Sequence, residues 1–404
     1  MGMESWRAQF ISLRCFIFLS LIATHCFLFV QTQALGQVDE CSALLQFKES
    51  FAINKSVSAD PLAYPKVSFW TREGDGNRSN CCSWDGVECD EDFGHVVGLD
   101  LRSSCLYGSI NSSNTLFRLV HLQWLDLSDN HFNFSQIPSR FGHDLSSLTY
   151  LNLSNSLFSG EIPPEISKLW KLSTLDLSFN DQKVDDDSFP LKLTKGNMRS
   201  LVQNLTTIKQ LHLNWVEMYF TVPDILVNAS SLTSLQLRFC GLNGEFPSFV
   251  SNLTQLEFLD LSDNEISGQI PSWLMKLTQL TSLNLGVNNL QGPIPRSLFQ
   301  LKNLEYLYLS GNNLSGLVEF DQFSKLKKLK GLDLSNNMLS VGITNDLSAP
   351  LPKLQTLALG ACNLTEFPKF LKNQSELTEL DLSGNYIHGP IPKWFWNATI
   401  ETLY

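Results

Sequence analysis

The chain has 404 residues and a formal net charge of -11 at pH 7, and 17% of its residues are charged. This acidic balance makes it a poor candidate for binding nucleic acid or an anionic lipid surface. The one basic run, from Lys325 to Lys330, is interpreted as a solvated helical face, with a site for an acidic peptide as the alternative.

The first 36 residues are predicted to be a secretory signal peptide. Arg7 and Arg14 precede an apolar run over residues 15–30, and small and polar residues follow as far as Gly36. A membrane helix is the alternative, but the run is short, contains polar residues and precedes a cysteine-bearing segment. Cleavage near Ala34 or Gly36 therefore places the mature chain in the secretory pathway, on the extracellular side.

Residues 37–95 are predicted to form an N-terminal cap. The segment from Glu40 to Phe51 has apolar residues at the spacing of a short amphipathic helix. Trp70 and Trp84 are expected to fill the junction between this cap and the repeats that follow it.

The cysteines indicate an oxidised cap. Two of the nine lie in the signal peptide, and four lie in the cap: Cys41, Cys81, Cys82 and Cys89. In an oxidising compartment these four predict two disulfides, and since the adjacent pair cannot bond without strain, two connectivities remain. A zinc site is the alternative, but no histidine has ligand spacing to the cluster, so no metal is expected. The other three, Cys105, Cys240 and Cys362, are expected to be buried thiols.

From residue 96 to residue 404 the chain repeats one pattern, LxxLxLxxNxLxGxIP, as in Leu256 to Pro271. One leucine recurs at intervals of 23 to 26 residues with a single exception: Leu99, Leu125, Leu151, Leu175, Leu211, Leu235, Leu259, Leu283, Leu307, Leu332, Leu357, Leu380 and Leu403. This is the period of a leucine-rich repeat. Each copy is expected to bury alternate leucines of a short strand, and the strands are expected to pair into one parallel concave sheet. The predicted fold is an α/β solenoid, a leucine-rich-repeat horseshoe or superhelix of about twelve copies.

The asparagine of the pattern lies where the chain turns away from the strand, and its carboxamide can bond backbone groups of adjacent turns. It is present as Asn130, Asn180, Asn264, Asn288, Asn312, Asn337 and Asn385. The other copies carry Ser104, Ser156, Val216, Cys240 and Cys362. Ser and Cys can replace part of the bonding and Val cannot, so the copy around Val216 is expected to be locally irregular.

The exceptional interval, from Leu175 to Leu211, is 36 residues, which places roughly a dozen extra residues within 181–204. Insertions in solenoids emerge as loops on one face. Asp185, Asp186 and Asp187 lie in this insertion and suggest a calcium site. No Gly-punctuated Asp-x-Asp loop accompanies them, so we interpret them as solvated charges.

Asn-x-Ser/Thr sequons predict a heavily glycosylated surface. The candidate acceptors are Asn54, Asn77, Asn111, Asn133, Asn204, Asn228, Asn252, Asn313, Asn373 and Asn397. Two further sequons, at Asn152 and Asn363, are interpreted as accidents of a pattern that is rich in Asn and Ser.

Three motifs together resemble a known family. The combination of C-x-ALLQFK from Cys41, CCSWDGVEC from Cys81 and the copies of LxxLDLSxNxxSGxIP resembles the extracellular part of plant leucine-rich-repeat receptor-like proteins, the class that includes fungal-resistance receptors. The GxIP ending, as in Gly268 to Pro271, is the plant-specific mark. The resemblance implies disulfides joining Cys41 to Cys81 and Cys82 to Cys89. It also implies recognition of a microbial or endogenous ligand at the cell surface, with signalling delegated to partner kinases.

The chain ends at Tyr404 in the middle of a copy, without a terminal cap, a second apolar span or a kinase signature. We therefore expect a fragment of a longer protein. The resemblance implies further repeats, an acidic juxtamembrane stretch, a membrane helix and a short cytoplasmic tail, so a membrane anchor is expected beyond the C-terminal end of this chain.

Outward strand positions, which are expected to line the concave face, are mostly Asp or Ser. The departures are candidates for ligand binding: His212, Trp215, Gln236, Arg238, Phe239, Phe258, Tyr306 and Tyr308. Exposed aromatic residues and Arg often anchor interfaces, so residues 212–239 predict a binding patch, with ordinary surface substitution as the alternative. The histidines do not pair with a nucleophile and an acid at a recognisable spacing, so no catalytic residue and no cofactor are predicted.

Three functions fit these observations. The first is a cell-surface receptor-like protein that binds an extracellular peptide, protein or glycan and signals through co-receptor kinases in plant defence. The second is a secreted inhibitor of polygalacturonases, although such inhibitors are more compact and close with a cysteine-bearing cap. The third is the ectodomain of a receptor kinase, whose kinase would follow Tyr404. An enzymatic activity is not expected.

Overall fold

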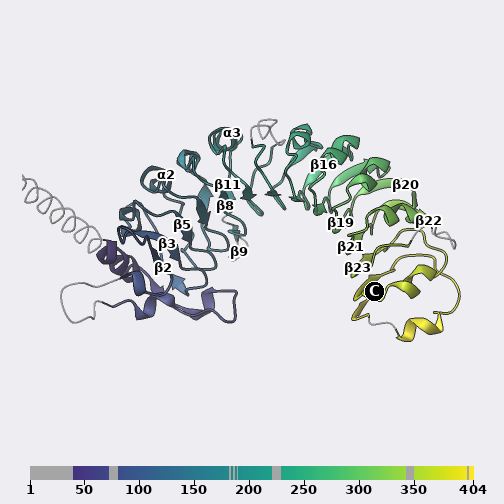
Figure 1. Ribbon diagram of the computed structural model, residues 1–404, viewed down its shortest axis with the longest axis horizontal. Helices are drawn as coiled ribbons and strands as arrows, with labels where there is room; N and C mark the ends of the chain where they lie inside the picture. The colour runs from purple at the N-terminus through teal and green to yellow at the C-terminus, as the bar shows by residue number, and fades with distance from the viewer. Residues whose placement is uncertain are drawn as a thin grey trace, which may run out of the picture.

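The computed structural model describes residues 40–71, 81–181, 183–184, 187–188, 190–220, 229–342, 350–397 and 400–404, with the backbone alone for 183–184, 187–188 and 397. The predicted signal peptide and the cleavage site near Ala34 lie outside these residues. The repeats form an open arc, with short strands along its inner side and short helices along its outer side (Figure 1). The solenoid predicted from the repeat period is therefore confirmed.

The inner sheet contains fourteen strands in chain order, interrupted only where shorter strands belong to other sheets. They are β2 (Val87–Cys89), β3 (Val96–Asp100), β5 (Trp124–Asp126), β6 (Tyr150–Asn152), β8 (Thr174–Asp176), β12 (Gln210–His212), β13 (Ser234–Gln236), β15 (Phe258–Asp260), β17 (Ser282–Asn284), β19 (Tyr306–Tyr308), β21 (Gly331–Asp333), β23 (Thr356–Ala358), β24 (Glu379–Asp381) and β25 (Thr402–Leu403). The recurring leucines pair in register, including Leu175 with Leu211 across the insertion. These leucines are fully buried from Leu99 to Leu357, so the predicted register is confirmed.

A second set of strands lies beyond the turn of each copy. It comprises β14 (Asn243–Glu245), β16 (Glu265–Gln269), β18 (Asn289–Gly292), β20 (Asn313–Glu319) and β22 (Met338–Gly342). Shorter pairs are β1 (Ala52–Ile53) with β4 (Leu106–Tyr107) and β7 (Gly160–Glu161) with β11 (Leu191–Lys192). Sequence patterns did not separate these strands from the loops, because they are short and polar.

The outer side of the arc is formed by short helices. The α-helices are residues 40–49, α2 (Arg140–Asp144) and α3 (Lys195–Asn204). The 3-10 helices are η1 (Lys55–Val57), η2 (Lys66–Phe69), η3 (Cys81–Ser83), η4 (Thr115–Arg118), η5 (Pro164–Lys168), η7 (Ser248–Asn252), η8 (Ser272–Lys276), η9 (Arg296–Gln300), η10 (Phe320–Lys325), η11 (Lys369–Asn373) and η12 (Lys393–Asn397). The GxIP proline precedes several of them, as Pro271 precedes η8, because its fixed φ suits a helix start.

Asparagine side chains connect consecutive copies. The Asn180 carboxamide oxygen accepts from the N–H groups of Ser156 and Phe158 at 3.0 and 3.1 Å. Its nitrogen donates to the carbonyls of Leu153 and Leu177, each at 2.9 Å. Each such asparagine thereby satisfies backbone groups that the turn has removed from water.

The substitutes at this position act as predicted. The Ser156 hydroxyl donates to Leu127 O at 2.8 Å, and the Cys240 thiol donates to Leu213 O at 3.1 Å. Val216 is fully buried, and its N–H closes its own turn on Leu213 O at 3.2 Å, whereas the N–H of Asn264 donates to Val287 O in the next copy. The irregularity expected at Val216 is confirmed for this turn, while strand β12 keeps its register.

The insertion adds two elements to one copy. Strands β9 (Lys183–Val184) and β10 (Asp187–Ser188) pair as a short antiparallel hairpin, and α3 replaces the usual 3-10 helix. Helix α3 has 10 residues and buries Met198, Leu201 and Val202. Asp185 and Asp186 lie outside the described residues, and of Asp187 only the backbone is described.

The cap is pinned by the disulfides Cys41–Cys81 and Cys82–Cys89, which confirms the pairing implied by the family resemblance. Residues 40–49 are helical, as predicted. Trp70 is 1% exposed and stacks on Trp84 with ring centroids 5.4 Å apart. Strand β2 then pairs antiparallel with β3, so the cap covers the first edge of the inner sheet.

Free thiols occur at Cys105, Cys240 and Cys362, all buried as predicted. Burial raises the pKa of the Cys240 thiol to about 12, and it does the same for Cys362.

The basic run is not a helical face, which corrects the sequence interpretation. Helix η10 ends at Lys325, and the following lysines bond separate acceptors instead. Lys328 donates to the Asn303 side chain, and Lys330 pairs with Glu305 at 2.6 Å. The lysines after η10 bond residues of neighbouring copies because the segment there already turns toward strand β21.

Candidate ligand-binding surface

The outward Asp of most inner strands is engaged in a local turn. The Asp260 carboxylate accepts from the N–H and the hydroxyl of Ser262 at 2.9 and 2.6 Å. Asp126 binds Ser128 in the same way. These Asx turns explain the recurring Asp-x-Ser sequence. Copies in which another residue replaces the Asp are therefore distinctive.

His212 and Gln236 replace the Asp in β12 and β13, and both lie on the inner sheet as predicted. The His212 ring bonds the Ser234 hydroxyl at 2.9 Å through Nε2, and its Nδ1 lies 3.5 Å from Asp176. Gln236 accepts from the Asn214 amide at 2.8 Å. The two side chains are half-buried in this network and are therefore held in fixed positions.

Trp215, Arg238 and Phe239 do not lie on the concave strands, which corrects the sequence prediction. Strands β12 and β13 end at His212 and Gln236, so these three residues belong to the turns that follow. The rings of Trp215 and Phe239 stack at 4.4 Å with 25° between their planes. Arg238 Nε donates to Asp263 at 2.8 Å. We call this edge of the arc, formed by the turns after the inner strands, the rim.

The residue directly before the template asparagine has positive φ in successive copies along the rim. Positions that suit this conformation carry Asp, Asn or Gly, such as Asp129, Asn155 and Gly311. Four of five consecutive copies break this preference: Phe179, Trp215, Phe239 and Val287 have φ of 59°, 65°, 54° and 52°, and only Asp263, between the last two, follows it. Bulky residues are strained in this region, and strain of this kind clusters at functional sites.

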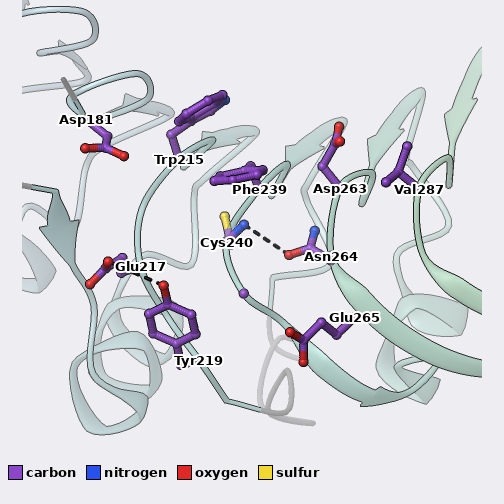
Figure 2. Close-up of a pocket in the computed structure, with 11 residues that line it drawn as sticks. Asp181, Trp215, Glu217, Tyr219, Phe239, Cys240, Asp263, Asn264, Glu265 and Val287 are labelled. Atoms are coloured by element: carbon purple, nitrogen blue, oxygen red, sulfur yellow. Dashed lines mark hydrogen bonds between the residues drawn. The ribbon is translucent and has the colours of Figure 1, made fainter. Parts of the chain in front are cut away.

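These rim residues border a hollow of about 530 Å³. It is lined by Asp181, Trp215, Glu217, Tyr219, Phe239, Cys240, Gly241, Asp263, Asn264, Glu265 and Val287. Figure 2 shows the two stacked rings between Asp181 and Glu217 on one side and Asp263 and Glu265 on the other. Phe239 is 52% exposed and Tyr219 is 69% exposed, so the aromatic surface is accessible to a ligand.

The floor of the hollow depends on one glycine. Gly241 has φ of 67°, and a Cβ added there would lie 2.5 Å from Tyr219 Cδ1. The Tyr219 ring therefore lies directly on backbone. The Glu217 carboxylate, to which the Tyr219 hydroxyl donates at 3.4 Å, together with burial raises the pKa of this phenol.

Further hollows adjoin the first toward the cap. One of about 430 Å³ shares Asp181 and Trp215 with it and reaches the cap loop at residues 56–59. The next, of about 450 Å³, shares Ala59 and Asn155 with the second and contains Asp129. The rim thus offers a chain of connected depressions between the cap and the centre of the arc.

Phe258, Tyr306 and Tyr308 lie on inner strands, as predicted, but apart from the rim residues. Phe258 is opposite Ser234 and Ser282 in β15, and β17 separates it from the tyrosines in β19. The tyrosine rings lie 6.2 Å apart. The structure therefore divides the eight predicted residues into an inner-sheet group, a rim group and a separate tyrosine pair.

Asp129 joins the cap loop to the repeats. Its carboxylate accepts from the Ser58 hydroxyl, from the Ala59 N–H at 2.8 Å and from the Ser103 hydroxyl at 2.7 Å. Burial opposes ionisation, but these hydrogen bonds outweigh it, so the pKa of the Asp129 carboxyl is lower than its ordinary value.

The contact is expected to make the cap sensitive to acid. Because the pKa is lower in the folded state, the contact stabilises the fold above the ordinary aspartate pKa of about 3.9 and is lost as pH falls through the folded-state value. Urea unfolding should therefore show Asp129→Asn less stable than the wild type at pH 7, with the difference shrinking at about pH 2. The exposed Asp92→Asn variant serves as the control. A difference that is constant with pH would contradict this account.

Seven of the ten candidate acceptors can be located, and these seven are exposed: Asn54, Asn111, Asn133, Asn204, Asn252, Asn313 and Asn373. Asn77 and Asn228 lie outside the described residues, as does the side chain of Asn397. Asn152 is half-buried on β6 and bonds Asp126 and Ser154, which agrees with its interpretation as incidental. Asn363 is exposed, so nothing in its position separates it from the other candidates.

Among the described residues, one group has the ligand types and spacing for a metal ion: Glu40, His95 and His121, whose nearest ligand atoms lie within 4.8 Å of one another. Sequence reasoning missed it by searching only near the cysteines. The two imidazole rings stack at 4.0 Å with 28° between their planes. The in-plane lone pairs of stacked rings do not converge on one point, so the geometry fits a stacked pair beside a carboxylate better than coordination.

The rim group also contains residues that sequence reasoning did not identify, namely Phe179, Asp181, Tyr219, Glu265 and Val287. The sequence carried one signal for them. The position before each template asparagine should favour Asn, Asp or Gly, and the run of Phe, Trp, Phe and Val there departs from that rule.

Models of two repeat families match parts of the chain. One, described as leucine rich repeat, matches residues 230–290 and 270–314. The other, also described as leucine rich repeat, matches residues 121–143, 147–169, 303–326 and 376–398.

Curated plant proteins are similar over about half of the chain. Receptor-like protein 7 of Arabidopsis thaliana is 36% identical over 213 residues, which are 52% of this chain and 20% of that protein. Receptor-like protein Cf-9 of Solanum pimpinellifolium is 36% identical over 194 residues, which are 46% of this chain and 21% of that protein. The similarity thus spans about a fifth of the length of each relative.

Solved structures of plant receptor ectodomains share the fold. The ectodomain of the receptor kinase GASSHO1/SCHENGEN3 from Arabidopsis thaliana, in complex with CASPARIAN STRIP INTEGRITY FACTOR 2, is 28% identical with a TM-score of 0.63, over 90% of this chain and 44% of that one. The Arabidopsis receptor kinase HAESA, in complex with the peptide hormone IDA and the co-receptor SERK1, is 25% identical with a TM-score of 0.61, over 88% of this chain and 67% of that one.

No helix within the described residues is both long and apolar enough to cross a membrane. The repeat pattern, the disulfide-pinned cap and the matching repeat models show that the chain is built of leucine-rich repeats, and the curated proteins it resembles are plant receptor-like proteins.

Proposed function

We propose that the chain is the recognition part of a plant cell-surface receptor, which binds an extracellular peptide, protein or glycan and signals through partner co-receptor kinases in defence. The observation that carries this proposal is the rim group, in which stacked, accessible aromatic rings are held beside a hollow by strained backbone. Aromatic residues held in this way bury a large area on binding at little cost in side-chain freedom.

The solved relatives support the ligand and partner classes of the proposal. HAESA binds a peptide hormone and a co-receptor on the same kind of solenoid. Since solenoid surfaces vary freely over a constant core, the resemblance supports recognition as the activity without specifying the ligand. Defence as the biological setting follows from the resemblance to resistance receptors.

The proposal predicts that extracellular plant or microbial fractions contain a ligand that binds the secreted chain saturably. The quadruple variant His212→Ala, Trp215→Ala, Arg238→Ala and Phe239→Ala should lose this binding by about tenfold or more, with unchanged secretion. Biolayer interferometry on the immobilised chain measures both proteins, and protease or glycosidase treatment of the fraction identifies the ligand class.

The exposed pair Trp170→Ala and Glu376→Gln provides a matched control, since Trp170, two residues after η5, is 58% exposed and Glu376 is exposed as well. If the quadruple variant bound the ligand as tightly as the wild type, these residues would not form the binding surface. Absence of saturable binding to the folded wild-type chain would contradict recognition itself, and hydrolysis of a cell-wall polymer by the chain would point to an enzyme.

A receptor-kinase ectodomain is the second candidate, because the GASSHO1/SCHENGEN3 ectodomain aligns with 90% of this chain. Sequencing the native transcript beyond the codon for Tyr404 separates the two. A membrane span and a short tail would support the receptor-like protein, and a span followed by a kinase would support the receptor kinase.

A further inference from the structure

The hollow at Trp215 and Phe239 combines aromatic faces with carboxylates. Among the described residues, its lining includes Asp181, Glu217, Asp263 and Glu265 but no Lys, Arg or His. An aromatic face is negative, and a ring of carboxylates adds to the negative potential inside a depression with apolar walls. Such a site attracts cations and repels anions.

Neighbouring cations already neutralise part of this negative charge. The carboxylate that they leave unpaired indicates where a ligand cation could bind. Lys192 lies 3.2 Å from Glu217, and Arg238 lies 2.8 Å from Asp263. Glu265 has no side-chain hydrogen bond or ion pair within the described part of the chain, and it is exposed. In Figure 2 the Glu265 carboxylate points back toward the hollow, across from Tyr219 and Glu217.

The backbone strain at the two aromatic residues is not explained by packing of the core. Trp215 and Phe239 have positive φ, and their stacked rings remain accessible instead of entering the core. The copies with Asp129, Asp263 and Gly311 accommodate the same turn with residues that suit positive φ. Strained positions of this kind persist where the surrounding structure or a function maintains them.

From these observations we propose that this hollow binds a basic side chain, Arg or Lys, of an extracellular peptide, with the cation between the Trp215–Phe239 stack and the carboxylates of Glu217 and Glu265. The inference rests on the proposed recognition function and narrows its ligand to a peptide with a basic anchor residue. The volume of about 530 Å³ is within the usual range for ligand pockets.

Other occupants fit the hollow less well. An apolar side chain would stack on the rings but would remove the carboxylates from water without compensation. An acidic ligand would be repelled by them. A neutral glycan could stack on the rings, but it would not neutralise the charge of Glu265. The experiment includes a glycan as the competing ligand.

The test uses the secreted full chain and three probes: acetyl-Gly-Arg-Gly-amide, acetyl-Gly-Gln-Gly-amide and cellotetraose. Ligand-observed NMR titration at low ionic strength measures each affinity. The Arg peptide should bind saturably in the millimolar range and about tenfold more tightly than the Gln peptide, since a partly desolvated cation–π contact contributes on the order of that factor. High salt should weaken the Arg peptide selectively.

Two variants test the two components of the site. Trp215→Ala and Glu265→Gln should each reduce the affinity for the Arg peptide by about fivefold to tenfold without changing the melting temperature. Trp170→Ala and Glu376→Gln are the matched controls on exposed positions outside the hollow, and they should leave the affinity unchanged.

Three outcomes overturn the inference: no saturable binding of the Arg peptide, equal affinity for the Gln peptide, or unchanged binding in both hollow variants. Binding of cellotetraose that is lost with Trp215→Ala, without preference for the Arg peptide, would assign the hollow to a glycan instead. If these titrations gave one of the contradicting results while the chain still bound an extracellular ligand saturably, the basic anchor residue would be excluded. The proposed recognition function would not be contradicted.

Discussion

Asn180→Ala is expected to lower the free energy of unfolding by about 3 kcal/mol or more, because an unpartnered buried polar group costs about 1–3 kcal/mol and several would be created. Asn180 is 1% exposed, and its side chain satisfies two N–H groups and two carbonyls of adjacent copies. Alanine fills less space and bonds none of them. Urea unfolding followed by circular dichroism measures the loss.

Asn180→Ser should be intermediate, because Ser156 shows that a hydroxyl at this position still donates to the carbonyls but leaves the N–H groups to other acceptors. The exposed Asn289→Ala variant should stay within about 0.5 kcal/mol of the wild type, as surface substitutions usually do. A loss for Asn180→Ala no larger than that of Asn289→Ala would show that water can replace the asparagine in this turn.

Removing the Cys41–Cys81 disulfide is expected to cost more than removing Cys82–Cys89. The two bonds close segments of 40 and 7 residues, for which the chain-entropy relation gives about 4 and about 2 kcal/mol, respectively. The paired variants Cys41→Ser with Cys81→Ser and Cys82→Ser with Cys89→Ser measure this difference by denaturant unfolding and by secreted yield.

Cys41, which lies in the cap helix, and Cys81 are also fully buried, so the first pair of substitutions places two hydroxyls in an apolar site. The corresponding Ala variants control for this effect, because they remove the bond without adding a polar group. Equal losses in the two Ala pairs would mean that loop length does not govern the contribution of these bonds.

The sequence predicted the inner sheet well because one physical rule governs every copy. A leucine in each strand must be buried against the next, so the 23-to-26-residue spacing was sufficient to predict pairs such as Leu259 with Leu283. The cap disulfides needed more than spacing, since two connectivities satisfied the geometry and only the family resemblance distinguished them.

The rim was harder to predict because it depends on backbone conformation rather than on alternation. The sequence prediction extended the concave face past His212 to include Trp215, but the strand ends at His212 and the chain turns through positive φ at Trp215. Strand ends of this kind are set by hydrogen bonds between copies, which a single copy does not reveal. The hollow is formed by five neighbouring turns, so it becomes visible only when they are stacked.

The three buried thiols are distributed along the solenoid, with Cys105 in the first copy, Cys240 near the middle and Cys362 near the end. Burial that raises a thiol pKa to about 12, as at Cys240, leaves almost no thiolate to react at neutral pH. Alkylation at each cysteine therefore requires the copy around it to open. The three cysteines are therefore built-in probes of local opening. Their separate alkylation rates would show how stability, which comes from contacts between neighbouring copies, differs between the ends of the arc and its middle.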